Sequence, residues 1–176
     1  IEVGVNVPNA SIMVIERESF LPGVVEGEEV FRERIRVFPE GFLVLEVPGS
    51  TGPVGYVCSE IWDGTEKLSA GLFEMGHAVE QRHRPRGRVL YVSSTGLLRS
   101  ARGRGLGHLL FSTLVSRVRL ARPDVTSIVL IVSEAWTAAR RIYASEGFVE
   151  VLRIDGFFQP VGGRREAGIV MRRDGF

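Results

Sequence analysis

The sequence predicts an α+β fold, in which helices pack on a mixed β-sheet. Residues 42–47 and 54–62 are apolar runs separated by PGSTGP, a pattern typical of two strands joined by a turn. An extended segment at 89–97 leads through a glycine-rich turn into a helical segment at 108–120. A short β-branched run at 127–132 (SIVLIV) indicates a buried strand. Strands and helices therefore alternate along most of the chain.

The front half of the chain contains two predicted helices before the hairpin. Residues 2–7 alternate weakly and indicate a first strand. Asn9 or Ser11 can cap a helix that continues to Ser19. A second helix is predicted over 27–38, because apolar residues recur among charges until Pro39. The hairpin strands 42–47 and 54–62 follow.

The middle and the end of the chain continue the alternation. Residues 63–87 lack clear periodicity and predict a long loop of the kind that often covers a site, although the spacing of Leu68, Leu72 and Met75 allows a helical turn. After the segments at 89–97, 108–120 and 127–132, a helix is predicted over 135–146, ended by Gly147. Strands over 149–154 and 166–172 complete a count of six or seven strands and four helices.

Composition restricts the class of protein. With 176 residues, 44% hydrophobic and 24% charged, the chain is expected to form one soluble domain spanning 1–176. A net charge of +1 argues against nucleic acid as a partner. A single cysteine, Cys58, excludes an internal disulfide and favours the cytoplasm. The absence of a long apolar run or a signal peptide argues against a membrane location.

The segment 102–107 (RGRGLG) has the physical properties of a phosphate-binding loop. It lies between a strand and a helix, so its free amides and the positive end of the helix dipole meet at one point. Glycine allows close approach of the backbone to a phosphate, and arginine adds charge-assisted hydrogen bonds. The spelling R-x-x-G-x-G is neither a P-loop nor a dinucleotide fingerprint.

A second motif follows at the next helix, where Ala139, Tyr143, Gly147 and Phe148 fill the frame A-x-x-x-Y-x-x-x-G-F. Together the two motifs resemble the GNAT superfamily of acetyl-coenzyme A (acetyl-CoA) dependent N-acetyltransferases. The resemblance implies a twisted mixed sheet of six or seven strands with about four helices on both faces. It also implies that strands 89–97 and 127–132 splay apart, that acetyl-CoA enters the gap as co-substrate, and that no metal is needed.

The resemblance also implies roles for individual residues. The backbone of Gly96 and its neighbours would pair with the pantetheine arm, with Gly96 letting the strand bulge open and the Leu97 amide acting as oxyanion donor. Tyr143 would contact the cofactor sulfur and protonate the leaving thiolate. The expected cofactor-binding residues are Gly96, Leu97, Leu98, Arg102, Gly103, Arg104, Gly105, Leu106, Gly107, His108 and Tyr143.

Two narrower resemblances point to different acceptors. The front half, with ERESF at 16–20 and Trp62, is similar to arylalkylamine (serotonin) N-acetyltransferases, but their two strand histidines are replaced by Tyr91 and Ser93. The tail, with GRREAGIVM at 163–171, is similar to ribosomal-protein alanine N-acetyltransferases, but their glutamate is replaced by Ile131. Both expected bases are therefore missing.

Other residues can fill the acceptor side. Strand alternation predicts Tyr91, Ser93, Thr95 and Leu97 on one face. Tyr91, Ser93 and Trp62 are the expected substrate contacts. Glu60 is the favoured base because its strand pairs beside the site, and the alternatives are Glu134, His77 and His83.

The expected function is transfer of an acetyl group to a primary amine by direct attack in a ternary complex. The acceptor is a small-molecule amine or a peptide N-terminus. A peptide α-amine is less basic than an alkylamine, so it needs less help from a base. The alternatives are a protein N-terminal acetyltransferase and a non-catalytic acyl-CoA-binding module. Basic residues at 82–88 suggest nucleic-acid binding, which the net charge disfavours. A homodimer is left open.

Overall fold

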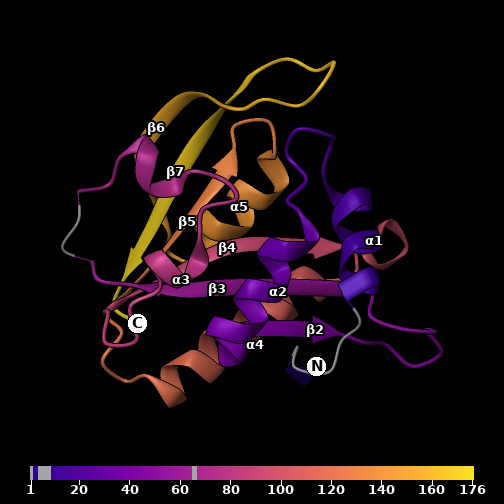
Figure 1. Cartoon of the computed structure of the whole chain (residues 1–176), viewed down its shortest axis with the longest axis horizontal. Helices are drawn as coiled ribbons and strands as arrows, with labels where there is room; N and C mark the ends of the chain where they lie inside the picture. The colour runs from indigo at the N-terminus through magenta and orange to yellow at the C-terminus, as the bar shows by residue number, and fades with distance from the viewer. Residues whose placement is uncertain (1, 4–8, 65–66) are drawn as a thin grey trace.

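A seven-stranded sheet organises the molecule, with strand order β1-β2-β3-β4-β5-β7-β6. The computed structural model describes residues 2–3, 9–64 and 67–176. Neighbouring strands are antiparallel except β4 and β5, which are parallel. The predicted α+β class and mixed sheet are therefore confirmed (Figure 1). The strands are β1 (Glu2–Val3), β2 (Phe42–Leu45), β3 (Gly55–Trp62), β4 (Val89–Leu97), β5 (Ser127–Ser133), β6 (Val149–Phe158) and β7 (Glu166–Asp174).

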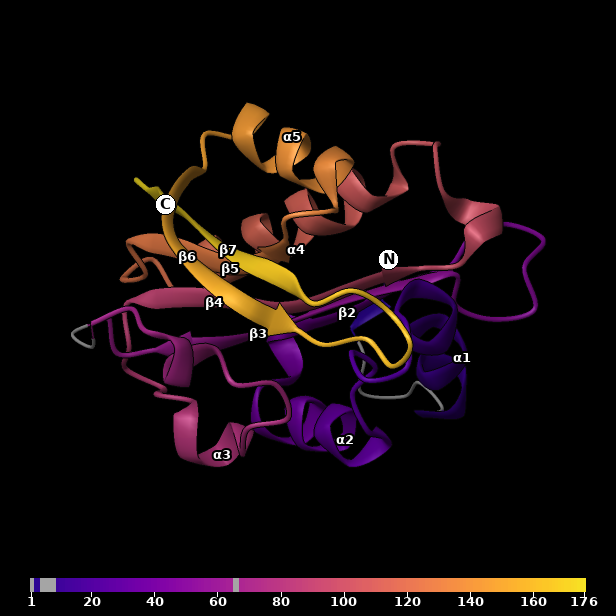
Figure 2. The ribbon, with the colours of Figure 1, turned by 90° about the horizontal axis from the view of Figure 1, so that it is seen from above.

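Helices cover both faces of the sheet, as predicted. Figure 2 shows α4 and α5 on one face and α1, α2 and α3 on the other. The described part of the chain has five α-helices, one more than predicted, because α3 forms a single turn inside the segment expected to be a loop. The helices are α1 (Asn9–Ser19), α2 (Glu28–Val37), α3 (Val79–Arg82), α4 (Leu106–Ala121) and α5 (Thr137–Ser145).

The remaining differences from the predicted elements are small. Within the predicted loop, a 3₁₀ turn η3 (Ala70–Phe73) lies where the spacing of Leu68, Leu72 and Met75 suggested one. Strand β6 continues to Phe158, four residues beyond its predicted end. Most of the strand predicted over 2–7 lies outside the described residues, which include only Glu2–Val3 of it.

The core is formed by apolar side chains on both faces of the sheet. On the α4 face, Leu110 and Leu114 are fully buried against strand residues such as Leu90. On the opposite face, Ile12 of α1 and Phe31 of α2 pack against the inward side chains of β2 and β3. This alternation along each strand is the burial pattern expected for a sheet sandwiched between helix layers.

A β-bulge interrupts the pairing of β3 with β4. Cys58 pairs with Ser94, but Ser59 pairs with Val92, so Ser93 is the extra residue. The prediction that the strand bulges at Gly96 is therefore wrong. The extra residue also reverses the alternation that follows it.

The predicted common face of Tyr91, Ser93, Thr95 and Leu97 is wrong for the same reason. Tyr91 stacks on Trp62 on the α1–α3 face, whereas Leu97 packs against the core on the α4 face. The hydrogen bond between the side chains of Thr95 and Tyr143 of α5 places Thr95 on the α4 face as well. The bulge therefore distributes the polar residues of β4 over both faces.

The two central strands separate beyond the bulge, as predicted. Residues 89–92 of β4 pair with residues 127–130 of β5, and the pairing ends there. The last residues of β5 continue to pair with β7 on their other side. The carboxyl-terminal half of β4 therefore has no strand partner on the β5 side, and a V-shaped opening forms between the two strands.

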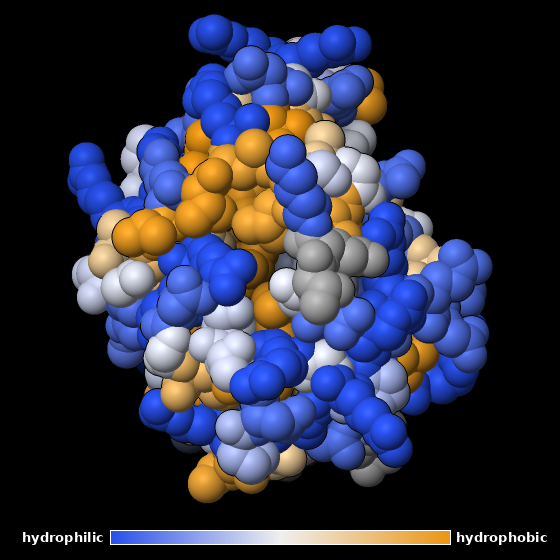
Figure 3. Space-filling view, turned by 90° about the vertical axis from the view of Figure 1, so that its left-hand side faces the viewer, coloured by the Kyte–Doolittle hydropathy of each residue, from blue (hydrophilic) through white to orange (hydrophobic). Residues whose placement is uncertain are grey.

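The surface of the molecule combines charged regions with one apolar region. Figure 3 shows the face at the left of Figure 1, where hydrophobic side chains gather in a patch bordered by hydrophilic ones. Among the described residues, no helix has both the length and the apolar character required to cross a bilayer.

Gly96 has a packing role that a substitution can test. A Cβ at this position would lie 2.5 Å from Cε1 of Tyr56 and 3.1 Å from Cγ2 of Ile15. We expect Gly96→Ala to lower the free energy of unfolding by about 1–3 kcal/mol through overpacking. Gly52→Ala is the matched control, because a Cβ there meets nothing within 4 Å. Urea unfolding measures both, and equal stabilities would contradict this packing role.

Candidate functional site

A cavity of about 140 Å³ occupies the opening between β4 and β5. Its walls come from the bulged part of β4, the end of β5, helices α1 and α5, and the segment around His77. Of the residues predicted to form the site, Tyr91, Ser93 and Tyr143 line this cavity. Leu97, Glu60 and Trp62 do not line it.

Tyr143 lies on α5 at the α4 side of the cavity. Its ring packs against Phe111 and Phe148, with centroids 5.6 and 5.8 Å away. Burial raises the pKa of the Tyr143 phenol, and a hydrogen bond with Thr95 lowers it in part, leaving a net rise. The phenol is therefore neutral near pH 7 and can act as a hydrogen-bond or proton donor.

The glycine-rich loop has the conformation that the sequence motif requires. Gly103 and Gly105 have φ angles of +71° and +73°, which residues with a side chain rarely adopt. Gly105 is also the N-cap of α4 and provides no side-chain cap, so the first amides of the helix remain open to a ligand. A Cβ at Gly107 would lie 3.2 Å from Cδ1 of Leu97.

The charged side chains of this loop have different surroundings. The guanidinium of Arg102 donates to the Leu97 carbonyl at 2.9 and 3.0 Å and to the Glu18 carbonyl at 3.1 Å. The side chain of Arg104 is exposed. His108 Nε2 lies 2.6 Å from Glu146 Oε1, which links the start of α4 to the end of α5. Arg102 thus connects the loop to α1, and His108 connects the start of α4 to the end of α5.

The backbone of β4 directs alternate amides into the opening. The Leu98 amide donates to the Val54 carbonyl on the β3 side. The amides of Leu97 and Thr95 therefore point away from β3, toward the gap between β4 and β5. The Leu97 amide, the predicted oxyanion donor, donates to Ser19 Oγ at 3.1 Å.

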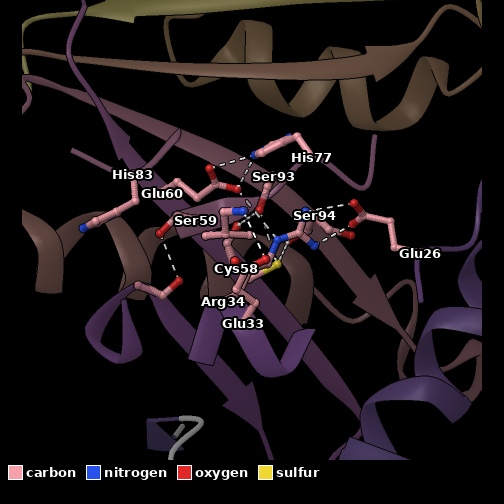
Figure 4. Close-up of polar contacts among 12 residues, drawn as sticks. Glu26, Glu33, Arg34, Cys58, Ser59, Glu60, His77, His83, Ser93 and Ser94 are labelled. Atoms are coloured by element: carbon pink, nitrogen blue, oxygen red, sulfur yellow. Dashed lines mark hydrogen bonds and ion pairs between the residues drawn. The ribbon is translucent and has the colours of Figure 1, made fainter. Parts of the chain in front are cut away.

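A cluster of buried charged side chains, which includes Arg34 of α2, forms one part of the cavity wall. Figure 4 shows Arg34 between Glu26 and the pair formed by Glu60 and His77. Arg34 binds Glu26 through two hydrogen bonds of 2.5 and 2.9 Å, and its Nε lies 3.8 Å from Glu60 Oε1. Burial would raise the pKa of Glu26, but Arg34 holds it below its ordinary value. The carboxylate of Glu26 is thus neutralised within the cluster.

His77 lines the cavity together with two other members of this cluster, Arg34 and Glu26. Its Nδ1 donates to the Glu74 carbonyl at 2.8 Å, and its Nε2 lies 2.9 Å from Glu60 Oε2. Burial lowers the pKa of His77, but the hydrogen bond and the charge of Glu60 raise it by more than burial lowers it. The pKa of His77 is therefore above its ordinary value. The Glu74 carbonyl can only accept, so Nδ1 donates, and the Glu60 carboxylate beside Nε2 favours the imidazolium form.

Of the candidate bases named from the sequence, His77 lines the cavity, whereas the other three do not. Glu60 is fully buried, pairs with Tyr91 across the strands as predicted, and accepts hydrogen bonds from His77 and Trp62. His83 accepts the Ile61 amide at 3.2 Å outside the cavity. Glu134 binds Arg153 and the Ala167 amide, also outside the cavity.

Sequence reasoning missed Glu16, a carboxyl on α1 that lines the cavity and is 1% exposed. It accepts a short hydrogen bond from the Tyr56 hydroxyl and a 2.9 Å bond from the Glu26 amide. Burial raises the pKa of Glu16 to about 7, although both hydrogen bonds oppose the shift. Glu16 follows Ile12 by four residues and therefore lies on the same, buried face of the helix. This spacing is the feature of the sequence that could have indicated its burial.

The sequence model of the acetyltransferase (GNAT) family matches residues 10–148, which include the glycine-rich loop and all the cavity-lining residues except Phe157 and Phe158. The chain belongs to the GNAT family. No curated protein sequence matches this GNAT protein significantly. The family membership predicted from the two motifs is thus confirmed.

Solved structures with the GNAT fold superpose on nearly the whole chain. The GphF GNAT-like decarboxylase in complex with isobutyryl-CoA has a TM-score of 0.74 at 18% identity, covering 94% of both chains. The loading GNATL domain of CurA from Lyngbya majuscula has a TM-score of 0.77 at 15% identity, covering 94% of this chain and 92% of that one. The ribosomal-protein-S18-alanine N-acetyltransferase from Escherichia coli has a TM-score of 0.67 at 17% identity, covering 94% and 86%. At these identities the likeness establishes the fold alone.

The described residues of this GNAT protein contain no group of three or more histidine, cysteine, aspartate or glutamate side chains placed to hold a metal ion. The ionisable side chains that line the cavity include Glu16, His77 and Tyr143.

The His77–Glu60 pair should make stability depend on pH. Because the folded pKa of His77 is raised, its contribution is present below the unfolded pKa of about 6.5 and is lost as pH rises through the folded value. We expect the stability difference between the wild type and His77→Gln to be largest near pH 5.5 and to shrink by pH 8.5. Urea unfolding across this range measures it, and a difference independent of pH would contradict the pairing.

Proposed function

We propose that residues 1–176 form one N-acetyltransferase domain that transfers the acetyl group of acetyl-CoA to a primary amine. The observation that carries this proposal is the cavity between the separated strands β4 and β5, which lies beside the uncapped start of α4 and is lined by Tyr143. NAA60 from Arabidopsis thaliana, whose structure is similar to that of this chain, was solved in complex with acetyl-CoA. This similarity supports acetyl-CoA as the donor.

The diphosphate of the donor would bind the glycine-rich loop. Gly103 and Gly105 have left-handed conformations, and Gly105 begins α4 without a side-chain cap, so the amides of this loop can bind the phosphates beside the positive end of the α4 dipole. Arg104 is exposed and can add charge-assisted hydrogen bonds. Arg102 would hold the loop against the Leu97 carbonyl and approach the phosphates from there.

The pantetheine arm would lie along β4 beside Gly96, Leu97 and Leu98, in place of the missing strand partner. The amides of Thr95 and Leu97 both point into the opening, so they can donate to groups of the donor. Thr95 lines the cavity, whereas the Leu97 amide is bound to Ser19. We therefore add the Thr95 amide to Leu97 as a donor for the oxyanion that forms when the thioester is attacked.

Tyr143 would act as the general acid. The amine nitrogen attacks the thioester carbon, the C–N bond forms, and the C–S bond breaks as the tetrahedral intermediate collapses. The electron pair of the broken bond stays on sulfur, and the Tyr143 hydroxyl gives it a proton. The attacking nitrogen loses one proton as the amide forms, and this proton restores the Tyr143 hydroxyl through water. A neutral, raised-pKa phenol in the cavity is suited to this role.

The acceptor side of the cavity favours an amine with an apolar body. Aromatic rings, including Tyr91 and Phe157, line the cavity together with the carboxyl groups of Glu16 and Glu26. Tyr91 is held by Trp62, whose ring lies 4.0 Å away and stacks on it, so Trp62 would shape the acceptor site indirectly. Ser93 lies in the bulge at the cavity wall. Both a small arylalkylamine and a peptide N-terminus with an apolar first residue fit this chemistry.

Thiol release from acetyl-CoA tests the function directly. Purified protein is supplied with acetyl-CoA and either tryptamine or a short peptide with a free N-terminal alanine. Amine-dependent release supports the proposal, and the preferred amine identifies the acceptor class. Tight acetyl-CoA binding without release for any amine would instead support the binding-module alternative.

Replacement of Tyr143 tests the acid. We expect Tyr143→Phe to lower kcat about 100-fold or more while the Kd for acetyl-CoA stays within about twofold, because only the proton donor is lost. Ile142→Ala is the control, since Ile142 is a 43% exposed neighbour on the same helix. Full activity of Tyr143→Phe would exclude Tyr143 as the acid.

Replacement of Gly105 tests the phosphate loop. A side chain in the left-handed region costs about 1–2 kcal/mol, so we expect Gly105→Ala to weaken acetyl-CoA binding about tenfold. Gly162→Ala is the matched control, because Gly162 has a similar φ of +71° and, like Gly105, has nothing within 4 Å of an added Cβ. Calorimetric titration measures both, and equal Kd values would contradict the assignment of this loop.

A further inference from the structure

Glu16, Tyr56 and Ser94 form a continuous hydrogen-bonded chain at the cavity wall. The Tyr56 hydroxyl donates to Glu16 Oε2, and Ser94 Oγ lies 2.9 Å from the same hydroxyl. Glu16 and Ser94 both line the cavity, whereas Tyr56 is fully buried between them. The two ends of the chain therefore face the cavity, and the connection between them is shielded from water.

The chemistry of the three groups gives the chain a direction. An ionised carboxylate can only accept, so Tyr56 uses its one proton on Glu16. The Tyr56 oxygen must then accept from Ser94, which uses the one hydroxyl proton of that serine. The lone pairs of Ser94 Oγ are left free to accept a proton from a group in the cavity.

Glu16 differs from the other carboxyl groups around the cavity. Arg34 neutralises Glu26, and the imidazolium of His77 binds Glu60. Among the residues that the structure describes, no cation lies within ion-pair distance of Glu16. Glu74 also lines the cavity but is exposed to solvent, so Glu16 is the buried cavity carboxyl group whose charge is left to be neutralised by a proton.

The groups that surround Glu16 explain its readiness to take up a proton. Burial on α1 disfavours the charge, the neighbouring Glu26 carboxylate adds repulsion, and Arg34 of α2 opposes these effects only in part. The hydrogen bonds from the Tyr56 hydroxyl and the Glu26 amide favour the ionised form. The Cys58 thiol of β3, which faces the same region, has its pKa raised to about 11 and stays neutral.

The bulge in β4 places this chain opposite Tyr143. Ser94 contacts Tyr56 on the α1–α3 face, whereas the next residue, Thr95, contacts Tyr143 on the α4 face. A proton acceptor and a proton donor thus reach the opening from opposite faces of one strand. Transfer of an acetyl group between an amine and a thiolate requires that pair of groups.

We propose that Glu16 is the general base of the reaction and takes the proton of the acceptor amine through Ser94 and Tyr56. The proposal rests on the acetyltransferase function given above. The ammonium form of the acceptor gives a proton to Ser94 Oγ, Ser94 gives its own proton to Tyr56, and Tyr56 gives its proton to Glu16. The products are a neutral amine and a neutral Glu16 carboxyl group, and the hydroxyl groups of Ser94 and Tyr56 are unchanged.

The pH dependence of kcat/KM for Glu16→Gln tests this inference. We expect the wild type to gain activity as pH rises through about 7, where Glu16 ionises. Glu16→Gln should lose about 100-fold or more in kcat/KM at pH 7.5 and lose this rise near pH 7. Glu29→Gln is the matched control, since it removes the same charge from a side chain that is 86% exposed.

Two further variants distinguish a base from a structural residue. Tyr56→Phe keeps the ring that packs on Phe31 and Phe42 but interrupts the chain, and Ser94→Ala removes the group that faces the amine. Both should lower kcat/KM at least tenfold with an unchanged Kd for acetyl-CoA and an unchanged unfolding midpoint. They also keep the inference testable if Glu16→Gln does not fold.

The outcomes separate this inference from the proposed function. An active wild type with Glu16→Gln equally active and with the same pH profile would overturn the role of Glu16 alone. Full activity of both Tyr56→Phe and Ser94→Ala would overturn the path through these hydroxyl groups. A wild type that binds acetyl-CoA but acetylates no amine would overturn the proposed function, and the base with it.

Discussion

The extra residue in β4 is the constraint on which the site depends. Because Ser93 has no partner on β3, the strand bends there, and its pairing with β5 ends one residue earlier at Val92. Backbone donors beyond the bulge then face an opening instead of another strand. The same extra residue reverses the alternation, so that Ser94 lies on the α1–α3 face and Thr95 on the α4 face. One local irregularity thus creates both the space for a donor and the two-sided access to it.

The second constraint is electrostatic. A fully buried guanidinium has a large desolvation cost, and Arg34 offsets it by binding Glu26 directly and lying near Glu60. Glu60 in turn fixes His77, and Glu26 accepts the Gly76 amide, so the segment that follows η3 is attached to the cavity wall. The buried charges therefore position a segment that has few regular elements of its own.

The glycine-rich loop proposed to bind phosphate and the cavity depend on different physical effects. The loop depends on backbone conformation, which glycine makes accessible at Gly103 and Gly105, and on a helix start left without a cap. The cavity depends on burial, which moves the pKa of Glu16 upward to about 7 and keeps Tyr143 neutral. Under the proposed function, the donor binds at the loop and the reaction takes place in the cavity.

The sequence by itself determined most of the element order, the boundaries of β4, the glycine-rich turn before α4 and the helix that carries Tyr143, because hydrophobic period, glycine turns and helix caps are local properties. Only the tertiary structure decided where β4 bulges and which carboxyl group faces the cavity. A bulge is a mismatch between two paired strands, and burial of Glu16 depends on β3, α2 and the cavity wall. The sequence favours Glu60 as the base because its strand lies beside the site, but in the fold its side chain binds His77 and does not line the cavity. Contacts between segments distant in sequence set these features, and no local pattern encodes them.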